Sequence, residues 1–210
     1  MEKIWKKVEK FIDSYCALRF KFEEENRMKE TYKFFGSYFS SFMEELIQSF
    51  LPTRRRFIMG PLWIEGMEDI EIDGIIIKEE SLDSKDGLHR TRWFKPYMIS
   101  AIFEFKAHGL YGGRKDLNKQ IRKLNTIAKR IKKLCDNNNL PCFYITLQER
   151  TPKKANSINY KKITLTGLTE WHSFFLYNSD IVEDRRKGRP LRPYKENGLE
   201  ALIIALKEMD

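Results

Sequence analysis

Two carboxylates and one lysine have the types and the spacing that metal-assisted chemistry needs. Glu104 and Lys106 end an apolar stretch that begins near Tyr97, and Asp73 interrupts a run of isoleucines further upstream. Side chains alternate between the two faces of a strand, so Glu104 and Lys106 share one face. Charged groups at the end of an apolar strand are costly to bury unless they are paired or used. If the two strands are neighbours, Asp73, Glu104 and Lys106 meet at one end of a sheet.

This set of residues suits a hard divalent cation. Mg²⁺ and Mn²⁺ take oxygen ligands and keep several waters, so Asp73 and Glu104 are candidate ligands, and the backbone carbonyl of Phe105 is a further candidate. Such an ion lowers the pKa of its bound water and neutralises charge that develops on a phosphate. Lys106 would orient the attacking water or stabilise the transition state. The alternative interpretation is an exposed ion pair on an edge strand.

A strongly basic segment follows these residues. Residues 114–133 hold nine basic side chains and one acidic side chain, a net charge of +8, whereas the whole chain carries +9. Apolar residues recur at helical spacing from Ile121 to Ile131, so the basic side chains coat the exposed face of a helix. Such a face supports binding to phosphates, although a merely soluble helix is the alternative. The expected contacts are Arg114, Lys115, Lys119, Arg122 and Lys123.

Two further basic clusters are candidates for nucleic-acid binding. One contains Arg54, and the other begins with Arg185 and Arg186. The second lies among glycine and proline residues, so we expect a mobile arm that orders on nucleic acid, with a solvated loop as the alternative.

The composition predicts a globular protein with an anionic partner. Of the 210 residues, 41% are hydrophobic and 13% aromatic, which argues against wholesale disorder. The pI of about 9.3 favours nucleic acid or an anionic surface. No stretch approaches the roughly 18 apolar residues of a membrane-spanning helix, and the first residues lack a signal-peptide core. We therefore expect a cytoplasmic protein with no membrane partner.

Helices are predicted at the beginning of the chain. Residues 1–32 form one long charged helix whose apolar residues recur at spacings of four and three, from Ile4 to Phe22. This seam packs on its own domain or pairs with another copy in a homodimer. A second helix is expected over residues 38–50, after Gly36 and before Pro52.

Strands then dominate the central region. The predicted order is three strands, a helix and a fourth strand, followed by a less regular tail with a closing helix near 198–207. The first three strands form a meander, and the crossover helix places the fourth beside them. The predicted fold is therefore α/β, a small mixed sheet flanked by helices. The strands are expected at 56–64, 69–78, 97–106 and 141–147, and the central helix at 115–135.

The pattern resembles the PD-(D/E)XK nuclease superfamily over residues 36–148. Gly36, the Leu51-Pro52 pair, Asp73 and the Glu104-Phe105-Lys106 triplet stand where members carry a glycine, the end of the first core helix, a strand aspartate and Glu-x-Lys. The resemblance implies a restriction-endonuclease-like αβββαβ core. It also implies that Asp73 and Glu104 bind the metal and that Lys106 is the catalytic lysine. Residues 1–35 would be a helical extension, and residues 149–210 a second extension packed on the core.

Two departures from the family pattern concern the metal site. Ile72 precedes Asp73 where the family name has proline, and Ser40 stands where many members carry a glutamate on the first core helix. Glu44 lies one turn further on and is predicted to replace that glutamate. Whether one or two metal ions bind stays open.

The function expected from the sequence is a Mg²⁺- or Mn²⁺-dependent DNA endonuclease. Restriction or other defence, recombination and mobile elements are natural contexts, and RNA stays open as a substrate. The alternatives are a non-cleaving nucleic-acid-binding protein and a partner-recruiting subunit on the same fold.

Overall fold

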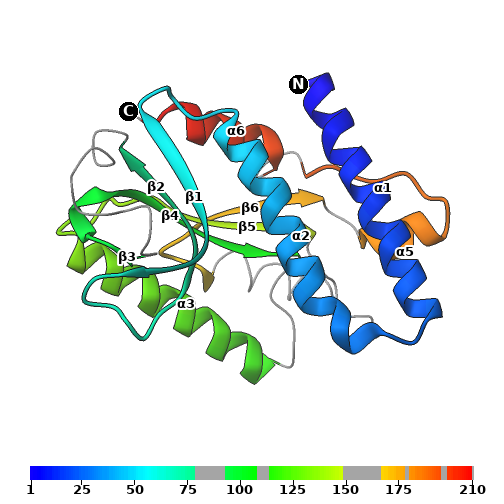
Figure 1. Cartoon of the computed structure of the whole chain (residues 1–210), viewed down its shortest axis with the longest axis horizontal. Coiled ribbons are helices and arrows are strands. Elements are labelled where there is room, and N and C mark those ends of the chain that lie inside the picture. Colours follow the sequence, from blue (N-terminus) through cyan, green and yellow to red (C-terminus); the bar gives the residue numbers. More distant parts are fainter. Residues whose placement is uncertain (79–92, 108–113, 149–166, 178–179, 195–197, 210) are drawn as a thin grey trace.

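The computed structural model describes residues 1–78, 93–107, 114–148, 167–177, 180–194 and 198–209, without the side chains of 28–33, 61, 114–116 and 148. Six strands of this part of the chain form one mixed sheet in the order β3-β1-β2-β4-β5-β6 (Figure 1). β1, β2 and β4 form an antiparallel meander, and β4, β5 and β6 run parallel. The strands are β1 (Arg55–Ile64), β2 (Ile72–Lys78), β3 (Trp93–Phe94), β4 (Ile99–Lys106), β5 (Cys142–Gln148) and β6 (His172–Tyr177).

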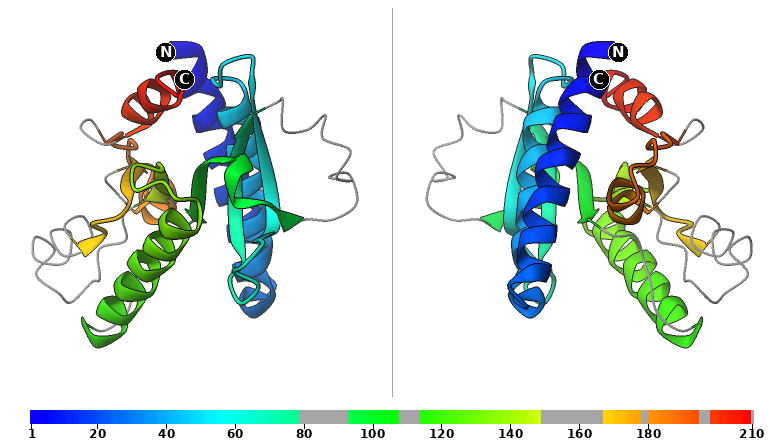
Figure 2. Two further views of the ribbon diagram at one scale, coloured as in Figure 1. Left: turned by 90° about the vertical axis from the view of Figure 1, so that its left-hand side faces the viewer. Right: turned by 90° about the vertical axis from the view of Figure 1, so that its right-hand side faces the viewer.

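Helices cover both faces of the sheet (Figure 2). α1, α2, α5 and α6 share one core with Phe103 and Phe105 of β4, whereas α3 packs on the other face against Ile75 and Ile102. No helix in the described ranges is long and apolar enough to cross a membrane. The helices are α1 (Glu2–Glu24), α2 (Met28–Gln48), α3 (Arg114–Leu134), α5 (Ile181–Arg186), α6 (Leu199–Lys207) and the short 3-10 helix η2 (Pro96–Met98).

The fold class predicted from the sequence is confirmed. The three-stranded meander, the crossover helix and the fourth strand follow in the expected order, with helices on both faces. The division into residues 1–35, 36–148 and 149–210 stays a prediction. α1 from the first part and α6 from the last part contribute to the same core as β4.

The boundary between the first two helices differs from the prediction. α1 ends at Glu24, and α2 already begins at Met28, so that Gly36 lies inside α2 and not before it. Asn26 adopts a left-handed conformation with a φ of 54°. Asparagine tolerates this region better than most residues, so one Asn can end a helix without glycine or proline. The helical spacing of apolar residues continues through both helices, so the sequence pattern did not indicate the boundary between α1 and α2.

The apolar seam of α1 is used within the chain. Val8 and Tyr15 are fully buried, and Phe11 is 7% exposed. Phe11 stacks on Phe42 of α2, with ring centroids 4.2 Å apart. Side chains buried in their own chain are not available to a second copy. The seam therefore packs on its own domain in this structure, and a homodimer through this helix stays a prediction.

The C-terminal region is more regular than expected. β6 extends the sheet, and Asp180 caps α5 by accepting a hydrogen bond from the Glu183 N–H at 3.2 Å. Arg185 and Arg186 end this helix, so they do not lie in the mobile arm that the sequence suggested. Arg185 pairs with Asp13 of α1 at 2.9 Å. Arg186 contacts Glu23 of α1 and lies over the Phe20 ring. The acids of α1 fix both arginines, which the local sequence does not show.

Candidate active site

Asp73 and Glu104 face each other across two neighbouring strands. β2 and β4 pair with Ile75 opposite Ile102 and Gly74 opposite Phe103. One further step in this antiparallel register places Asp73 opposite Glu104. Both residues therefore project from the same face of the sheet, together with Lys106 two residues further along β4. Ile75 and Ile102 of the same alternation pack with α3, so the three polar side chains lie on the α3 face.

The three side chains contact one another. The Asp73 Oδ2 accepts a hydrogen bond from the Phe105 N–H at 2.8 Å, in the place where the ladder between β2 and β4 ends. The Lys106 Nζ lies 3.8 Å from the Asp73 Oδ2 and pairs more closely with the Glu104 Oε1. The Asp73 carboxylate thus holds the end of β4 and the lysine at once. The structure thus brings these three side chains together, as the sequence predicted.

The electrostatics of the site reflect partial burial. The Glu104 side chain is 17% exposed, whereas those of Asp73 and Lys106 are 34% and 41% exposed. Burial and the Asp73 carboxylate raise the pKa of Glu104, while Lys106 and Lys123 oppose the rise. Burial lowers the pKa of Lys106, but Glu104 and Asp73 outweigh it, so the net pKa lies above the ordinary value. Lys106 therefore stays an ammonium at neutral pH.

Aromatic side chains fix the two strands from behind. Phe103 and Phe105 alternate with Glu104 and point to the α2 face, where both contact the Phe57 ring. Phe39 of α2 meets Phe105 edge-on, with centroids 6.3 Å apart. A Cβ added at Gly74 would lie 2.6 Å from the Phe57 Cζ. This glycine therefore stands next to Asp73 because the Phe57 ring needs its space.

The donor set fits a hard divalent ion in its chemistry. Two carboxylates from adjacent strands are what Mg²⁺ commonly takes from a protein, with waters completing its coordination. The Phe105 carbonyl stays a candidate third oxygen, since the Phe105 backbone borders the Asp73 carboxylate. Within the described ranges, no group of three or more His, Cys, Asp or Glu side chains is close enough to share an ion. Asp73 and Glu104 would therefore be the acidic ligands there.

Glu44 does not join this site. It lies on α2, whose buried residues Met43 and Ile47 pack on the opposite face of the sheet. Among the described residues, which include Glu44, no group of three acidic side chains close enough to share an ion combines it with Asp73 and Glu104. The structure thus does not bring Glu44 together with Asp73 and Glu104, and its role as a substitute ligand stays a prediction. The α2 residue that meets β4 at Phe105 is Phe39.

The alternative of an ion pair on an edge strand is wrong about the strand. β4 lies between β2 and β5, and pairs with β2 over Ile99–Phe103 and with β5 over Ile102–Lys106. The Lys106–Glu104–Asp73 group therefore sits at the end of a central strand, where a binding site is expected more often than on an exposed edge.

The two halves of the basic helix α3 differ in whether their basic side chains form ion pairs. In its C-terminal half, Arg130 makes two hydrogen bonds of 2.9 Å to Asp69, and Lys132 pairs with Glu170 at 3.2 Å. Lys119, Arg122 and Lys123 in the other half are exposed and form no ion pair with another described residue. Arg114 and Lys115 lie in the first turn, where side chains are outside the described part. Residues 108–113 are outside it as well.

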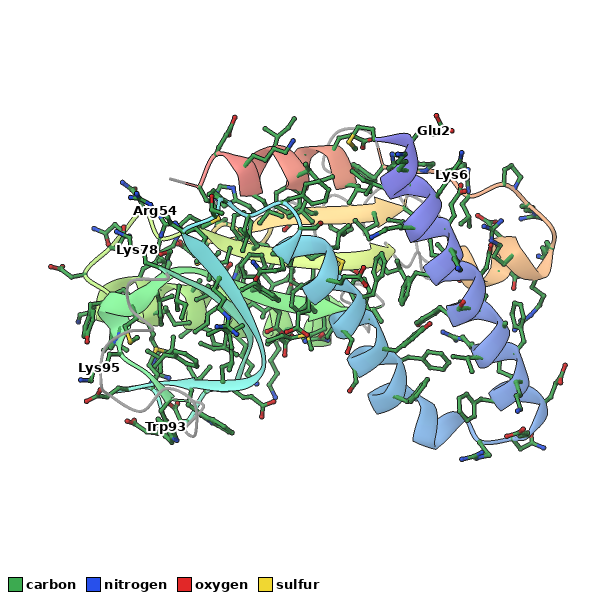
Figure 3. The ribbon with its side chains drawn as sticks, turned by 45° about the horizontal axis from the view of Figure 1, so that its top comes forward. Glu2, Lys6, Arg54, Lys78, Trp93 and Lys95 are labelled. Atoms are coloured by element: carbon green, nitrogen blue, oxygen red, sulfur yellow. The ribbon has the colours of Figure 1, made fainter. Side chains whose placement is uncertain are left out.

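Arg54 lies away from the candidate site. It precedes β1, and its neighbour Arg55 pairs with Lys78 at the end of β2 that is remote from Asp73. Figure 3 shows Arg54 and Lys78 together at this end of the sheet. The structure thus separates Arg54, Arg185 and Arg186 from the Asp73 site, and a nucleic-acid role for these three arginines stays a prediction.

A cavity that the sequence did not reveal occupies the same remote end. Its volume is about 600 Å³, and it does not include Asp73, Glu104 or Lys106. It forms where β1, β4, β5 and β6 begin and α3 and α6 end, so no local sequence pattern marks it. Among the polar and aromatic side chains in its wall are Arg55, Lys78, Tyr97, Ser100, His172 and Glu208.

Comparison with known proteins shows the fold. No protein-family model and no curated protein matches the sequence. The cAAA-bound structure of NucC from P. aeruginosa ATCC27853 is similar over 97% of this chain and 89% of its own, at 10% identity and a TM-score of 0.53. The apo structure of NucC from E. coli MS115-1 is similar over 81% of this chain and 83% of its own, at 12% identity and a TM-score of 0.49. The chain has a restriction-endonuclease-like fold. At such identity the likeness concerns the fold, and the site rests on the geometry of this chain.

Proposed function

We propose that this chain is a divalent-metal-dependent DNA endonuclease of the PD-(D/E)XK superfamily. The observation that carries the proposal is the meeting of Asp73, Glu104 and Lys106 at one end of two central strands. Partly buried carboxylates cost folding free energy, and a single lysine leaves the two of them with a net negative charge. Such a charge suits a cation that works on a phosphate. The restriction-endonuclease-like fold supports the same conclusion.

Each residue would have a distinct role. A bound Mg²⁺ or Mn²⁺ would supply an activated water and neutralise charge on the phosphate. Asp73 and Glu104 would hold the ion, with Asp73 oriented by the Phe105 N–H. Lys106 would donate a hydrogen bond to the attacking water or to a phosphate oxygen, where it stabilises the transition state. Its raised pKa keeps it charged for this role.

The N-terminal half of α3 would bind the DNA backbone. Lys119, Arg122 and Lys123 are exposed, and α3 covers the sheet face from which the site projects. Cations without an acidic partner release counterions from DNA on binding and so contribute affinity, whereas those already paired in the protein contribute less. The proposed DNA surface therefore ends near the middle of α3.

Cleavage of supercoiled plasmid tests the proposal. We expect nicked and linear products with Mg²⁺ or Mn²⁺ and none with EDTA. Linear duplex, single-stranded DNA and RNA of the same sequence would identify the substrate class. Intact substrates under every metal condition would contradict the nuclease assignment.

A non-cleaving DNA-binding protein is the second candidate. The observation that favours it is the absence of a third acid beside Asp73 and Glu104 among the described residues. Salt-dependent DNA binding with all substrates intact would select this candidate.

We also propose that a nucleotide controls the activity. The similar NucC structure from P. aeruginosa is a cAAA-bound form. In this chain the cavity of about 600 Å³ offers Arg55 and Lys78 against one acid, Glu208, a balance that suits phosphate groups. Plasmid cleavage measured with and without cAAA would test this regulation. Equal cleavage rates of wild type and Arg55→Ala in the presence of cAAA would contradict it.

A further inference from the structure

Lys123 lies on the flank of α3 that faces the candidate site. The rotation of α3 is fixed by apolar residues that pack on the sheet, among them Leu117, Ile121, Leu124 and Ala128. One flank of the helix faces the segment before β6, because the Asn125 Nδ2 donates to the Gly167 carbonyl at 2.7 Å and Lys132 pairs with Glu170. The other flank faces the turn between β1 and β2, where Arg130 binds Asp69.

Lys123 belongs to this second flank. It precedes Arg130 by seven residues, which is about two helical turns, so the two side chains share one stripe of α3. The β1–β2 turn leads directly into β2 and Asp73. The ammonium of Lys123 also acts electrostatically on the Glu104 carboxylate. Lys123 thus lies on the site's side of the helix.

The ammonium of Lys123 has no ion-pair partner among the described residues. Lys106 is already held by Glu104 and Asp73, and Lys129 pairs with Glu170 at 3.7 Å on the other flank. Lys123 is exposed and forms no ion pair within the described ranges. A flexible ammonium beside a carboxylate pair can meet an incoming phosphate while the pair holds a metal ion.

We propose that Lys123 is a second cation of the active site, which holds a non-bridging oxygen of the phosphodiester beside Asp73 and Glu104. This inference rests on the proposed nuclease function. It makes Lys123 a substrate-positioning residue, and its contact is distinct from the backbone contacts of Lys119 and Arg122. An anchored phosphate keeps the bond to be broken in line with the metal site, so the contact acts on the rate of the bound complex.

Single-turnover cleavage at saturating DNA tests the assignment. We expect Lys123→Ala to lower the rate of the bound complex by about 10- to 100-fold, with a much smaller change in Kd. Lys123→Arg should recover most of the rate, because it keeps the charge. Lys129→Ala is the matched control on the same helix and should stay within about twofold of wild type, since its exposed pair contributes little.

The outcomes separate this inference from the nuclease assignment. An active wild type with an unchanged rate for Lys123→Ala would overturn the role of Lys123 alone. A loss confined to Kd, equal to that of Arg122→Ala, would overturn it too and make Lys123 one more backbone contact. A wild type that cleaves no DNA would contradict the nuclease and this inference together.

Discussion

Asp73 has two roles in this chain. Its carboxylate accepts the Phe105 N–H where the ladder between β2 and β4 ends, and the same oxygen lies 3.8 Å from the Lys106 ammonium. A backbone N–H without an acceptor would otherwise cost free energy near the core. Asp73 is therefore tied to the strand end structurally as well as chemically.

Lys106→Ala is expected to abolish cleavage while DNA binding stays nearly intact. The reason is that Lys106 forms its ion pairs with Glu104 and Asp73 among the described residues and would act in the transition state. Parallel measurements of single-turnover rate and Kd would check this. Lys21→Ala, an exposed lysine on α1, is the control and should behave as wild type. Cleavage by Lys106→Ala at the wild-type rate would rule out the assigned role.

The grouping of Asp73, Glu104 and Lys106 could be predicted from sequence, because side chains alternate between the two faces of a strand with a period of two residues. Glu104 and Lys106 share a face by alternation alone, and Asp73 needed only a neighbouring strand. Glu44 could not be placed in the same way. Its position depends on where α2 begins and on its rotation, and both are decided by packing of Phe39 and Met43 against the sheet.

At the scale of elements, the meander and the crossover helix follow from sequence, but the helix break and the last strand do not. The break at Asn26 depends on one left-handed residue in a continuous apolar pattern. β6 is a short apolar strand, His172–Tyr177, whose pairing partner β5 lies upstream and parallel. Parallel pairing leaves no local turn signal, so the sequence alone showed only a less regular tail.

Two glycines offer a matched test of how the strands are held. Gly74→Ala should destabilise the fold by about 1–3 kcal/mol, because its Cβ would overlap the Phe57 ring, which Phe103 and Phe105 keep in place. Gly36→Ala should stabilise it by about 0.5–1 kcal/mol, since α2 offers open space there and alanine favours a helix. Urea denaturation would measure both. Equal effects of the two changes would contradict the packing described for β2.

At the scale of the whole molecule, net charge indicated an anionic partner but did not show where it binds. The +8 of residues 114–133 marked the exposed face of this helix as basic, and the predicted contacts were those from Arg114 to Lys123. The fold brings Asp69 and Glu170 from distant segments to its C-terminal half, where they pair with Arg130, Lys129 and Lys132. Pairing across such sequence distances has no local signature. The same holds for the cavity at the far end of the sheet, whose wall comes from many elements.

Neutralising the two halves of α3 should therefore give different results. Lys119→Gln combined with Arg122→Gln is expected to weaken DNA binding and to reduce the salt slope by about two, one for each lost phosphate contact. Lys129→Gln combined with Lys133→Gln removes the same charge from the other half and should change the slope less. Binding isotherms over a range of salt concentrations would measure this. Equal slopes for the two double variants would show that the halves are equivalent.

The central claim is that Asp73, Glu104 and Lys106 together form a metal-dependent nuclease site. The most direct test compares wild type with Asp73→Ala on supercoiled plasmid in Mg²⁺ or Mn²⁺, with circular dichroism to confirm that the variant is folded. We predict metal-dependent nicking or linearisation by wild type and its loss in the folded variant, because Asp73 is one of the two proposed acidic ligands. Cleavage by the folded Asp73→Ala variant at the wild-type rate would contradict the claim.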